Sequence, residues 1–370
     1  MIIKTHTAEP SKTMHSDPAF ELLLPNLRVN SGPSLWVIDE NITPYLSSLF
    51  ATADALAGDL HVLSNRYDIF LHFKSLGIPS SFNDFDFDAL ALPHFNHIYY
   101  RISKEKPVVH RIINQALAHL APEGELYLAG AKQEGIQSYL TNSAKITSCA
   151  LSKTRGKQQT CLGVLSLPNE IQVIESDNQL EDKNYTQSRE IVQTPQFNLH
   201  SKPGVFCWDR LDPGSLFLSQ HFEAFLAQEP SLPNSCLDLG CGYGFLAATA
   251  HHHKIKGIVA TDNNAAALHA CQLNFDLNNI PGQVIAADCG QSIKQQFDLV
   301  LCNPPFHHGF KTDPALTQKF LSNAARLTAK GGQALFVVNQ FISIENLARK
   351  HFNKYTELAN DNSFKLVVLE

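Results

Sequence analysis

Short apolar runs alternate with longer amphipathic stretches over most of this chain, and this alternation predicts an α/β fold built on parallel strands. In the C-terminal half, buried strands are predicted at residues 236–239, 257–261, 284–287 and 297–302. Helical stretches separate these runs, so the strands are expected to join one sheet with their carboxyl ends along one edge.

The N-terminal half repeats this organisation. Four similar strand-like runs occur at residues 35–38, 60–63, 98–100 and 125–129. Residues 109–128 and 318–337 each predict a helix, a Gly-containing turn and a strand in the same frame. The sequence therefore predicts two tandem Rossmann-like α/β domains, the second with a seven-stranded sheet and the first a copy of it.

Composition sets the domain boundaries. Residues 1–30 are polar and contain several prolines, which predicts a flexible N-terminal tail before a first domain at residues 31–168. Residues 169–194 are charged and rich in Asn and Gln, as expected of a linker, and residues 195–370 form the second domain.

The overall composition is that of a folded protein, because 44% of the 370 residues are hydrophobic and 17% are charged. No run is long enough to span a membrane and the first residues lack the layout of a signal peptide, so we expect a cytoplasmic protein without a membrane partner. The eight cysteines form no C-x-x-C pair, which favours free thiols over a disulfide framework or a metal site.

The formal net charge of −6 argues against an enzyme that holds naked RNA by broad electrostatic attraction. A local basic patch would have to bind the RNA instead. One cluster lies in the first domain, at Lys145, Lys153, Arg155 and Lys157, although such clusters are more often solvated faces.

The strand at 236–239 leads into a turn with an acid ahead of three alternate glycines, Asp238, Gly240, Gly242 and Gly244. A dinucleotide site has a different glycine spacing, G-x-G-x-x-G, and the carboxylate of Asp238 would repel the pyrophosphate of a dinucleotide. The acid suits a ligand that carries an amino group and a sulfonium. The turn therefore predicts a site for S-adenosyl-L-methionine.

Polar residues at the ends of the next strands complete this prediction. Asp262 is expected to accept hydrogen bonds from the ribose hydroxyls, and Asn263 is assigned to the same cofactor site. Asp288 is placed to meet the adenine amino group. The alternative is an α/β domain whose strands end in Asp without binding a nucleoside.

The chemistry is predicted at Asn303-Pro304-Pro305-Phe306, directly after the strand at 297–302. The Asn303 side-chain oxygen and the Pro304 carbonyl can each accept one N–H bond from an exocyclic amine, which orients its lone pair toward the methyl group. Asn303 would therefore border the cofactor as well as the acceptor. The ring of Phe306 offers a face on which a planar base can stack.

The segment that enters the second domain is expected to close over cofactor and base. Trp208 and Asp212 are assigned to substrate binding, together with Phe306 and His307. The alternative for Trp208 and Phe206 is packing at the domain junction.

These motifs carry a family resemblance. The chain from about residue 195 to 370 resembles class I S-adenosylmethionine-dependent methyltransferases and, more narrowly, the bacterial ribosomal RNA guanine-N2 methyltransferases. The resemblance rests on Pro203-Gly204-Val205-Phe206, Leu211-Asp212, Gly214-Ser215, the motif from Asn303 to His307, and Phe364-Lys365. The small-subunit type C family is the most similar, and the large-subunit type G family shares most of the motifs.

The resemblance implies methyl transfer to N2 of guanine 1207 in 16S ribosomal RNA, within the small ribosomal subunit, by a monomer. Two other reactions use a similar motif: N5 methylation of a protein glutamine and N6 methylation of adenine in nucleic acid. A different class of function, a cofactor-sensing RNA-binding assembly factor without catalysis, also fits the chain.

The first domain lacks both motifs. Residues 62–67 replace the glycine turn, and residues 99–103 replace the Asn-Pro-Pro-Phe motif. This degenerate methyltransferase-like copy is expected to support the fold, to recognise the substrate, or to do both.

Overall fold

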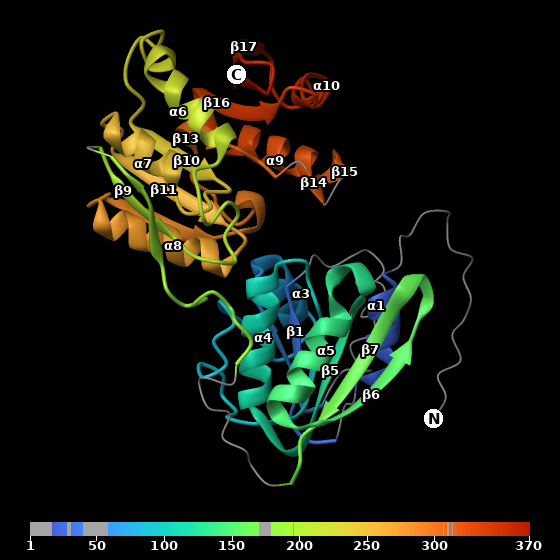
Figure 1. The fold of residues 1–370 in the computed structure, drawn as a ribbon. Helices are drawn as coiled ribbons and strands as arrows, with labels where there is room; N and C mark the ends of the chain where they lie inside the picture. The colour runs from blue at the N-terminus through green and yellow to red at the C-terminus, as the bar shows by residue number, and fades with distance from the viewer. Residues whose placement is uncertain are drawn as a thin grey trace. The chain divides into compact units, whose positions relative to one another are not determined.

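The computed structural model describes residues 17–27, 31–39, 58–169, 179–194, 196–305, 307–308, 311–312 and 314–370, the side chains of 307, 308, 311, 312 and 314 excepted. The chain forms two compact units, residues 1–182 and 183–370 (Figure 1). No helix in the described ranges is long and apolar enough to cross a membrane. All eight cysteines are free thiols, as predicted.

The C-terminal unit is built on a seven-stranded sheet with the strand order β12-β11-β10-β13-β16-β18-β17. The first five strands in this order are parallel, and the last two are antiparallel to their neighbours. The strand bounds are β10 Ser235–Leu239, β11 Gly257–Asp262, β12 Gly282–Ala286, β13 Phe297–Cys302, β16 Thr328–Asn339, β17 Tyr355–Asn360 and β18 Phe364–Leu369. The four strands predicted for this half are confirmed.

Helices cover both faces of this sheet because its strands are apolar on both sides. One core includes Cys236 of β10 and residues of α6 (Pro213–Leu226), α7 (Phe245–His252) and α8 (Ala265–Leu277). The other includes the next residue, Leu237, and residues of α9 (Pro314–Leu327) and α10 (Glu345–Ala348). The polar ends of β10, β11 and β13 therefore meet at one open edge.

Two small hairpins flank this sheet. β8 (Arg189–Gln193) pairs with β9 (Asn198–Ser201), and β14 (His307–His308) pairs with β15 (Lys311–Thr312). β8 lies within the range predicted as a linker, so part of that range is a strand of the C-terminal unit.

The N-terminal unit has a sheet of the same topology, with the order β3-β2-β1-β4-β5-β7-β6. Its strands are β1 Ser34–Ile38, β2 Leu60–Ser64, β3 Ser80–Phe82, β4 Phe95–Arg101, β5 Leu120–Ala131, β6 Ala150–Arg155 and β7 Thr160–Ser166. Its helices are α1 Pro18–Leu23, α3 Tyr67–Ser75, α4 Lys106–Ala118 and α5 Ile136–Thr147, with 3-10 turns at Leu24–Asn26, Lys132–Glu134 and Lys157–Gln159. The predicted duplication is confirmed.

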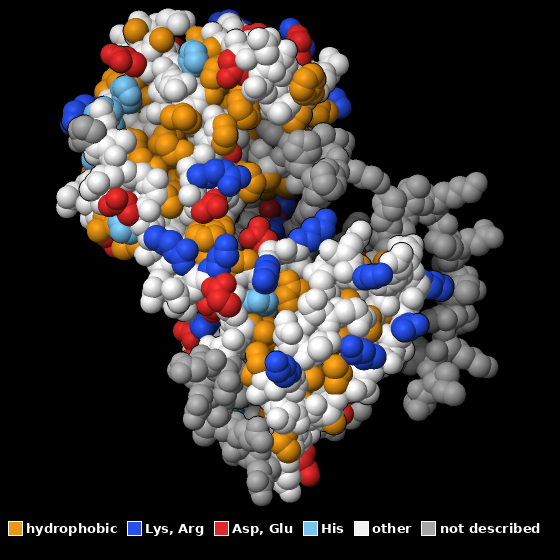
Figure 2. All heavy atoms as spheres, in the orientation of Figure 1, with side chains coloured by type: hydrophobic (Ala, Val, Ile, Leu, Met, Phe, Trp, Pro, Cys, Tyr) orange, Lys and Arg blue, Asp and Glu red, His pale blue; other side chains and the backbone are white. Residues whose placement is uncertain are grey.

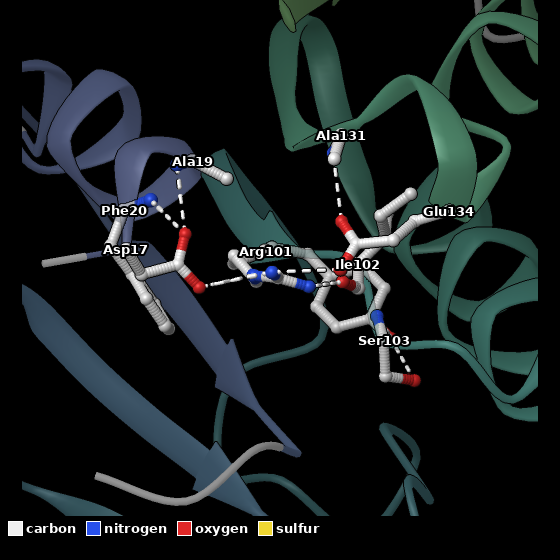
Figure 3. Close-up of polar contacts among 9 residues, drawn as sticks. Asp17, Ala19, Phe20, Arg101, Ile102, Ser103, Ala131 and Glu134 are labelled. Atoms are coloured by element: carbon white, nitrogen blue, oxygen red, sulfur yellow. Dashed lines mark hydrogen bonds and ion pairs between the residues drawn. The ribbon is translucent and has the colours of Figure 1, made fainter. Parts of the chain in front are cut away.

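The segment predicted as a flexible tail differs in its described part. Asp17 caps α1 by accepting hydrogen bonds from the backbone N–H groups of Ala19 and Phe20, and α1 buries Ala19, Phe20 and Leu23 in the core beneath β1. Asp17 also forms an ion pair with Arg101 at the end of β4, at 2.9 Å (Figure 3). A short helix with a polar cap and one apolar face is hard to distinguish from a polar tail by composition.

The strand order corrects one correspondence between the copies. β1 occupies the place of β10, whereas β2 occupies the place of β11. Residues 62–67 therefore correspond to the Asp262 region, and the counterpart of the glycine turn follows β1, where the described residues end at Asp39.

Basic side chains mark one surface of the N-terminal unit. Lys145 on α5, Lys153 and Arg155 on the edge strand β6, and Lys157 after it are all exposed. Figure 2 shows Lys and Arg side chains spread over one face of this unit with few acidic ones among them. This surface is compatible with contacts to a phosphate backbone.

Candidate active site

The glycine turn after β10 has positive φ angles, which residues with a side chain rarely adopt. Gly240, Gly242 and Gly244 have φ of 81°, 53° and 86°. A Cβ on Gly244 would lie 2.8 Å from Sγ of Cys271, so this glycine is required by packing against α8. A Cβ on Gly242 would meet nothing within 4 Å. The turn thus leaves open space at Gly242, where a ligand can approach the backbone.

Asp262 is fixed by the turn it faces. Its carboxylate accepts hydrogen bonds from the backbone N–H of Gly242 at 3.0 Å and of Asn264 at 2.9 Å. Asn263 lies half-buried beside it, and Asn264 caps α8 and donates to the Gly204 carbonyl at 2.9 Å. The glycine turn, β11 and the segment before α6 are therefore joined around Asp262.

Asp238 lies beneath the turn and is almost entirely buried. Its carboxylate accepts a hydrogen bond from the Ala247 N–H at 2.9 Å. Burial raises the pKa of Asp238 from 3.8 to about 7, and the nearby Asp262 adds to the rise. A cationic ligand in the turn would favour the charged form of this carboxyl.

Asp288 follows β12 and forms an ion pair with Lys319 of α9. The lysine holds the carboxylate at the edge of the site. The other carboxylate oxygen of Asp288 remains the candidate acceptor for an amino group.

Asn303 follows β13 and lies in a polar cluster with residues of α6. Its Nδ2 donates to Oδ2 of Asp212 at 2.5 Å and to Oγ of Ser215 at 2.9 Å. Asp212 is the N-cap of α6 and accepts the Ser215 N–H at 2.8 Å with the same oxygen. A Cβ on Gly214 would lie 3.3 Å from Nδ2 of Asn303, so the cluster is closely packed.

These contacts determine which way the Asn303 amide points. An ionised carboxylate can only accept hydrogen bonds, so the atom that faces Asp212 must be the NH2 group. The side-chain oxygen of Asn303 is then directed away from Asp212. The structure shows Asp212 in contact with Asn303, and its predicted role in substrate binding stays a prediction.

The structure describes only some of the remaining predicted site residues. Pro304 is buried beside Asn303, whereas Phe306 lies outside the described residues, as does the side chain of His307. Trp208 is half-buried, with Arg189 at 5.0 Å and Lys183 at 5.7 Å from its ring centroid. The described residues contain no group of three or more His, Cys, Asp or Glu side chains that could hold a metal ion.

The sequence analysis missed three residues of this edge. Ser215 and Phe364 belong to motifs of the family resemblance without a predicted role, and no sequence pattern distinguishes Lys319. Phe364 lies within 3.2 Å of the Cβ position of Gly214, next to the Asn303 cluster. The Asp-Pro pair at 212–213, a common helix start, was the available signal for the α6 cap.

The residues present fit a positively charged nucleoside ligand. The open side of Gly242, the fixed carboxylate of Asp262, the buried acid Asp238 and the acid at Asp288 lie at the ends of adjacent parallel strands. Ligands bind at this edge of open α/β sheets.

Comparison with known families agrees with this arrangement. Residues 196–368 match the model of the methyltransferase small domain, and residues 42–153 match the model of its N-terminal domain. The fold and the two family models identify the class of this protein as a methyltransferase.

The ribosomal RNA small subunit methyltransferase C of Pseudoalteromonas translucida (strain TAC 125) is 30% identical over 286 residues, which cover 76% of each chain. The protein of the same name from Shewanella pealeana is 26% identical over 359 residues, covering 94% of this chain and 97% of that one. The chain belongs to the ribosomal RNA small subunit methyltransferase C family.

A solved structure has the same fold over nearly the whole chain. It is the T. thermophilus 16S rRNA N2 G1207 methyltransferase in complex with AdoMet and guanosine, with a TM-score of 0.79 at 21% identity. The match covers 96% of this chain and 92% of that one, which confirms the two tandem methyltransferase domains.

Proposed function

We propose that this protein transfers a methyl group from S-adenosyl-L-methionine to the exocyclic N2 of a guanine in 16S ribosomal RNA. The observation that carries the proposal is the Asn303 amide, which Asp212 and Ser215 hold with its oxygen free to accept an N–H bond. The names of the relatives and the guanosine bound to the T. thermophilus protein support guanine as the acceptor.

The cofactor is held by residues of the glycine turn and the following strands. The backbone at Gly240 and Gly242 lies against the methionine part, and Asp238 beneath it favours the ligand's positive charge. Asp262 accepts from the ribose hydroxyls, and Asp288 accepts from the adenine amino group. The cofactor supplies an electrophilic methyl group on a sulfonium.

Asn303 and Pro304 orient the nucleophile. Their oxygens each accept one N–H of the guanine amine, so that the nitrogen lone pair points toward the methyl carbon. The nitrogen forms the new N–C bond while the C–S bond breaks and its electron pair remains on sulfur. The amine then releases one proton to water. No strong base is needed, since the nitrogen becomes acidic once it is methylated, and positioning dominates.

The substrate is the small ribosomal subunit, in which the target guanine is turned out of its surroundings. The acidic net charge disfavours a general grip on naked RNA, and the exposed basic surface at Lys153 and Arg155 offers a local contact instead. The protein acts as a monomer in the cytoplasm and needs no metal.

Methyl transfer from labelled cofactor tests this proposal. We expect wild-type protein to label guanine N2 of 16S RNA in small subunits, as mapped by mass spectrometry of the digested RNA. Asn303→Ala should lower turnover by orders of magnitude while cofactor affinity stays unchanged. Label in large subunits, in adenine or in protein would show that the proposed substrate is wrong. An absence of label in every substrate would favour a non-catalytic factor.

A further inference from the structure

Two aromatic side chains of the C-terminal unit are unusually exposed. Phe341 is 88% exposed and Phe206 is 73% exposed, whereas the next large hydrophobic side chain in the described residues, Leu277, is 48% exposed. Single exposed hydrophobic residues are common on protein surfaces and need no explanation. The location of these two is what distinguishes them.

Phe206 lies in the segment that leads into α6. Val205 before it is buried, and Cys207 after it has a positive φ of 51°, so the chain turns sharply at this aromatic residue. Gly204 accepts a hydrogen bond from Asn264, just beyond β11. The segment then reaches Asp212, the partner of Asn303. Phe206 is therefore held between the end of β11 and the acceptor site.

Phe341 lies in a tight turn directly after β16. Its backbone N–H donates to Oδ1 of Asn339 at 3.1 Å, and the Gln340 N–H donates to the Ser363 carbonyl at 2.9 Å. Asn339 pairs with Phe364, whose ring borders the Asn303 cluster at Gly214. Phe341 is thus held at the same edge of the sheet as Asn303.

The hydrogen bond of Gly204 to Asn264 relates Phe206 to the β11 side of the sheet, whereas Phe341 follows β16. The order β11-β10-β13-β16 puts Asn303, at the end of β13, between Phe206 on the β11 side and Phe341 on the β16 side. The β8 side of the same unit adds charge, because Arg189 and Lys183 lie over the ring of Trp208, two residues beyond Phe206. Exposed aromatic rings beside cations are the usual means of holding single-stranded RNA.

We propose that Phe206 and Phe341 stack on the bases that flank the target guanine, one on each side, and hold the RNA strand while the guanine occupies the Asn303 site. The inference rests on the proposed function, since it takes the strand that carries the target as the occupant. Every base has a π-face, so this grip tolerates many sequences and leaves the choice of the reacting base to Asn303 and Pro304.

Substitution in the full-length protein tests the proposal. We expect Phe206→Ala and Phe341→Ala each to raise KM for the small subunit by about 5- to 150-fold, the range measured for loss of one base stack. Turnover at saturating RNA, cofactor affinity and melting temperature should remain unchanged. Leu232→Ala is the control, because Leu232 is also exposed but precedes β10, at the opposite edge of the sheet.

Conservative variants distinguish stacking from general apolar contact. Phe→Tyr at either position should keep a normal KM, whereas Phe→Leu should behave like Phe→Ala. Leucine variants as active as tyrosine variants would overturn the proposal. So would a loss of activity on small subunits with no loss on protein-free 16S RNA, because the residues would then contact a ribosomal protein.

A binding measurement separates this inference from the proposed function. The affinity for a fluorescent single-stranded oligoribonucleotide, measured without cofactor, should fall in the Phe206→Ala, Phe341→Ala double variant. Equal affinity of wild type and double variant overturns the inference, whatever the methylation assay gives. A protein that binds the RNA through these rings but methylates no guanine would refute only the proposed function.

Discussion

Replacement of Asp212 by Ala tests how the Asn303 amide is oriented. In the structure one carboxylate oxygen accepts hydrogen bonds from both the Ser215 N–H and the Asn303 NH2 group. Alanine removes both hydrogen bonds. The Ser215 hydroxyl can donate as well as accept, so by itself it does not fix which end of the amide faces α6. The side-chain oxygen of Asn303 would then spend part of its time turned away from the substrate.

The two losses affect different quantities. Loss of the α6 cap should lower the free energy of unfolding by about 0.5–2 kcal/mol. Loss of a hydrogen bond to a charged group costs about 1.5–3 kcal/mol, which corresponds to a roughly ten- to 150-fold fall in turnover if the bond maintains the reactive orientation. Cofactor affinity should not change, because Asp212 belongs to the acceptor side of the site.

Asp212→Ser separates the two effects. Serine is a good N-cap, but its hydroxyl lies one bond nearer its own backbone and cannot reach Asn303 well. We expect stability close to wild type with turnover close to that of Asp212→Ala. Thermal unfolding and saturating methyl-transfer kinetics measure the two quantities. If turnover recovers together with stability in the serine variant, Asp212 acts only as a helix cap and the orientation argument is wrong.

Two further predictions concern the cofactor side. Because the folded-state pKa of Asp238 is about 7 rather than 3.8, ionisation opposes folding, so the unfolding free energy without cofactor should fall by on the order of 3 kcal/mol between pH 4 and 7. Asp238→Asn should remove most of that fall, as measured by denaturant unfolding at several pH values. Gly242→Ala should weaken cofactor binding in calorimetry, and its positive φ should also lower the unfolding free energy by about 1–2 kcal/mol. Gly331→Ala is the control, because Gly331 has a similarly open Cβ position and a φ of 82°. It should lower the unfolding free energy by a similar amount and leave cofactor affinity unchanged.

The strands and the duplication were predictable because their signals are local. Each strand of the C-terminal sheet is a continuous apolar run, since helices bury both of its faces, and the run from Phe297 to Cys302 matches β13 at both ends. The acids at the strand ends could be placed at one edge by topology alone.

The role of Asp212 could not be predicted in the same way. Asp212 and Asn303 are 91 positions apart in sequence, and their contact arises because α6 begins where β13 ends. A residue pattern locates the cap but does not show what else the cap touches. The same reason explains α1, whose cap Asp17 reaches Arg101 across 84 positions. The comparison of the two copies failed at residues 62–67 because strand order, which aligns β1 with β10, is not visible in a local pattern.

The two caps show how one scaffold gives a structural contact in one unit and a candidate catalytic one in the other. In each unit an Asp followed by Pro caps the helix before the first central strand and reaches the end of the fourth parallel strand in the sheet order. In the N-terminal unit the partner is the guanidinium of Arg101, which also pairs with Glu134 at 2.9 Å (Figure 3). A guanidinium has five donors and no acceptor, so it cannot receive the N–H of an amine. In the C-terminal unit the partner is the Asn303 amide, which donates to the cap and still has an oxygen to offer. The difference between the copies at this position is therefore a change from a side chain that only donates to one that can also accept.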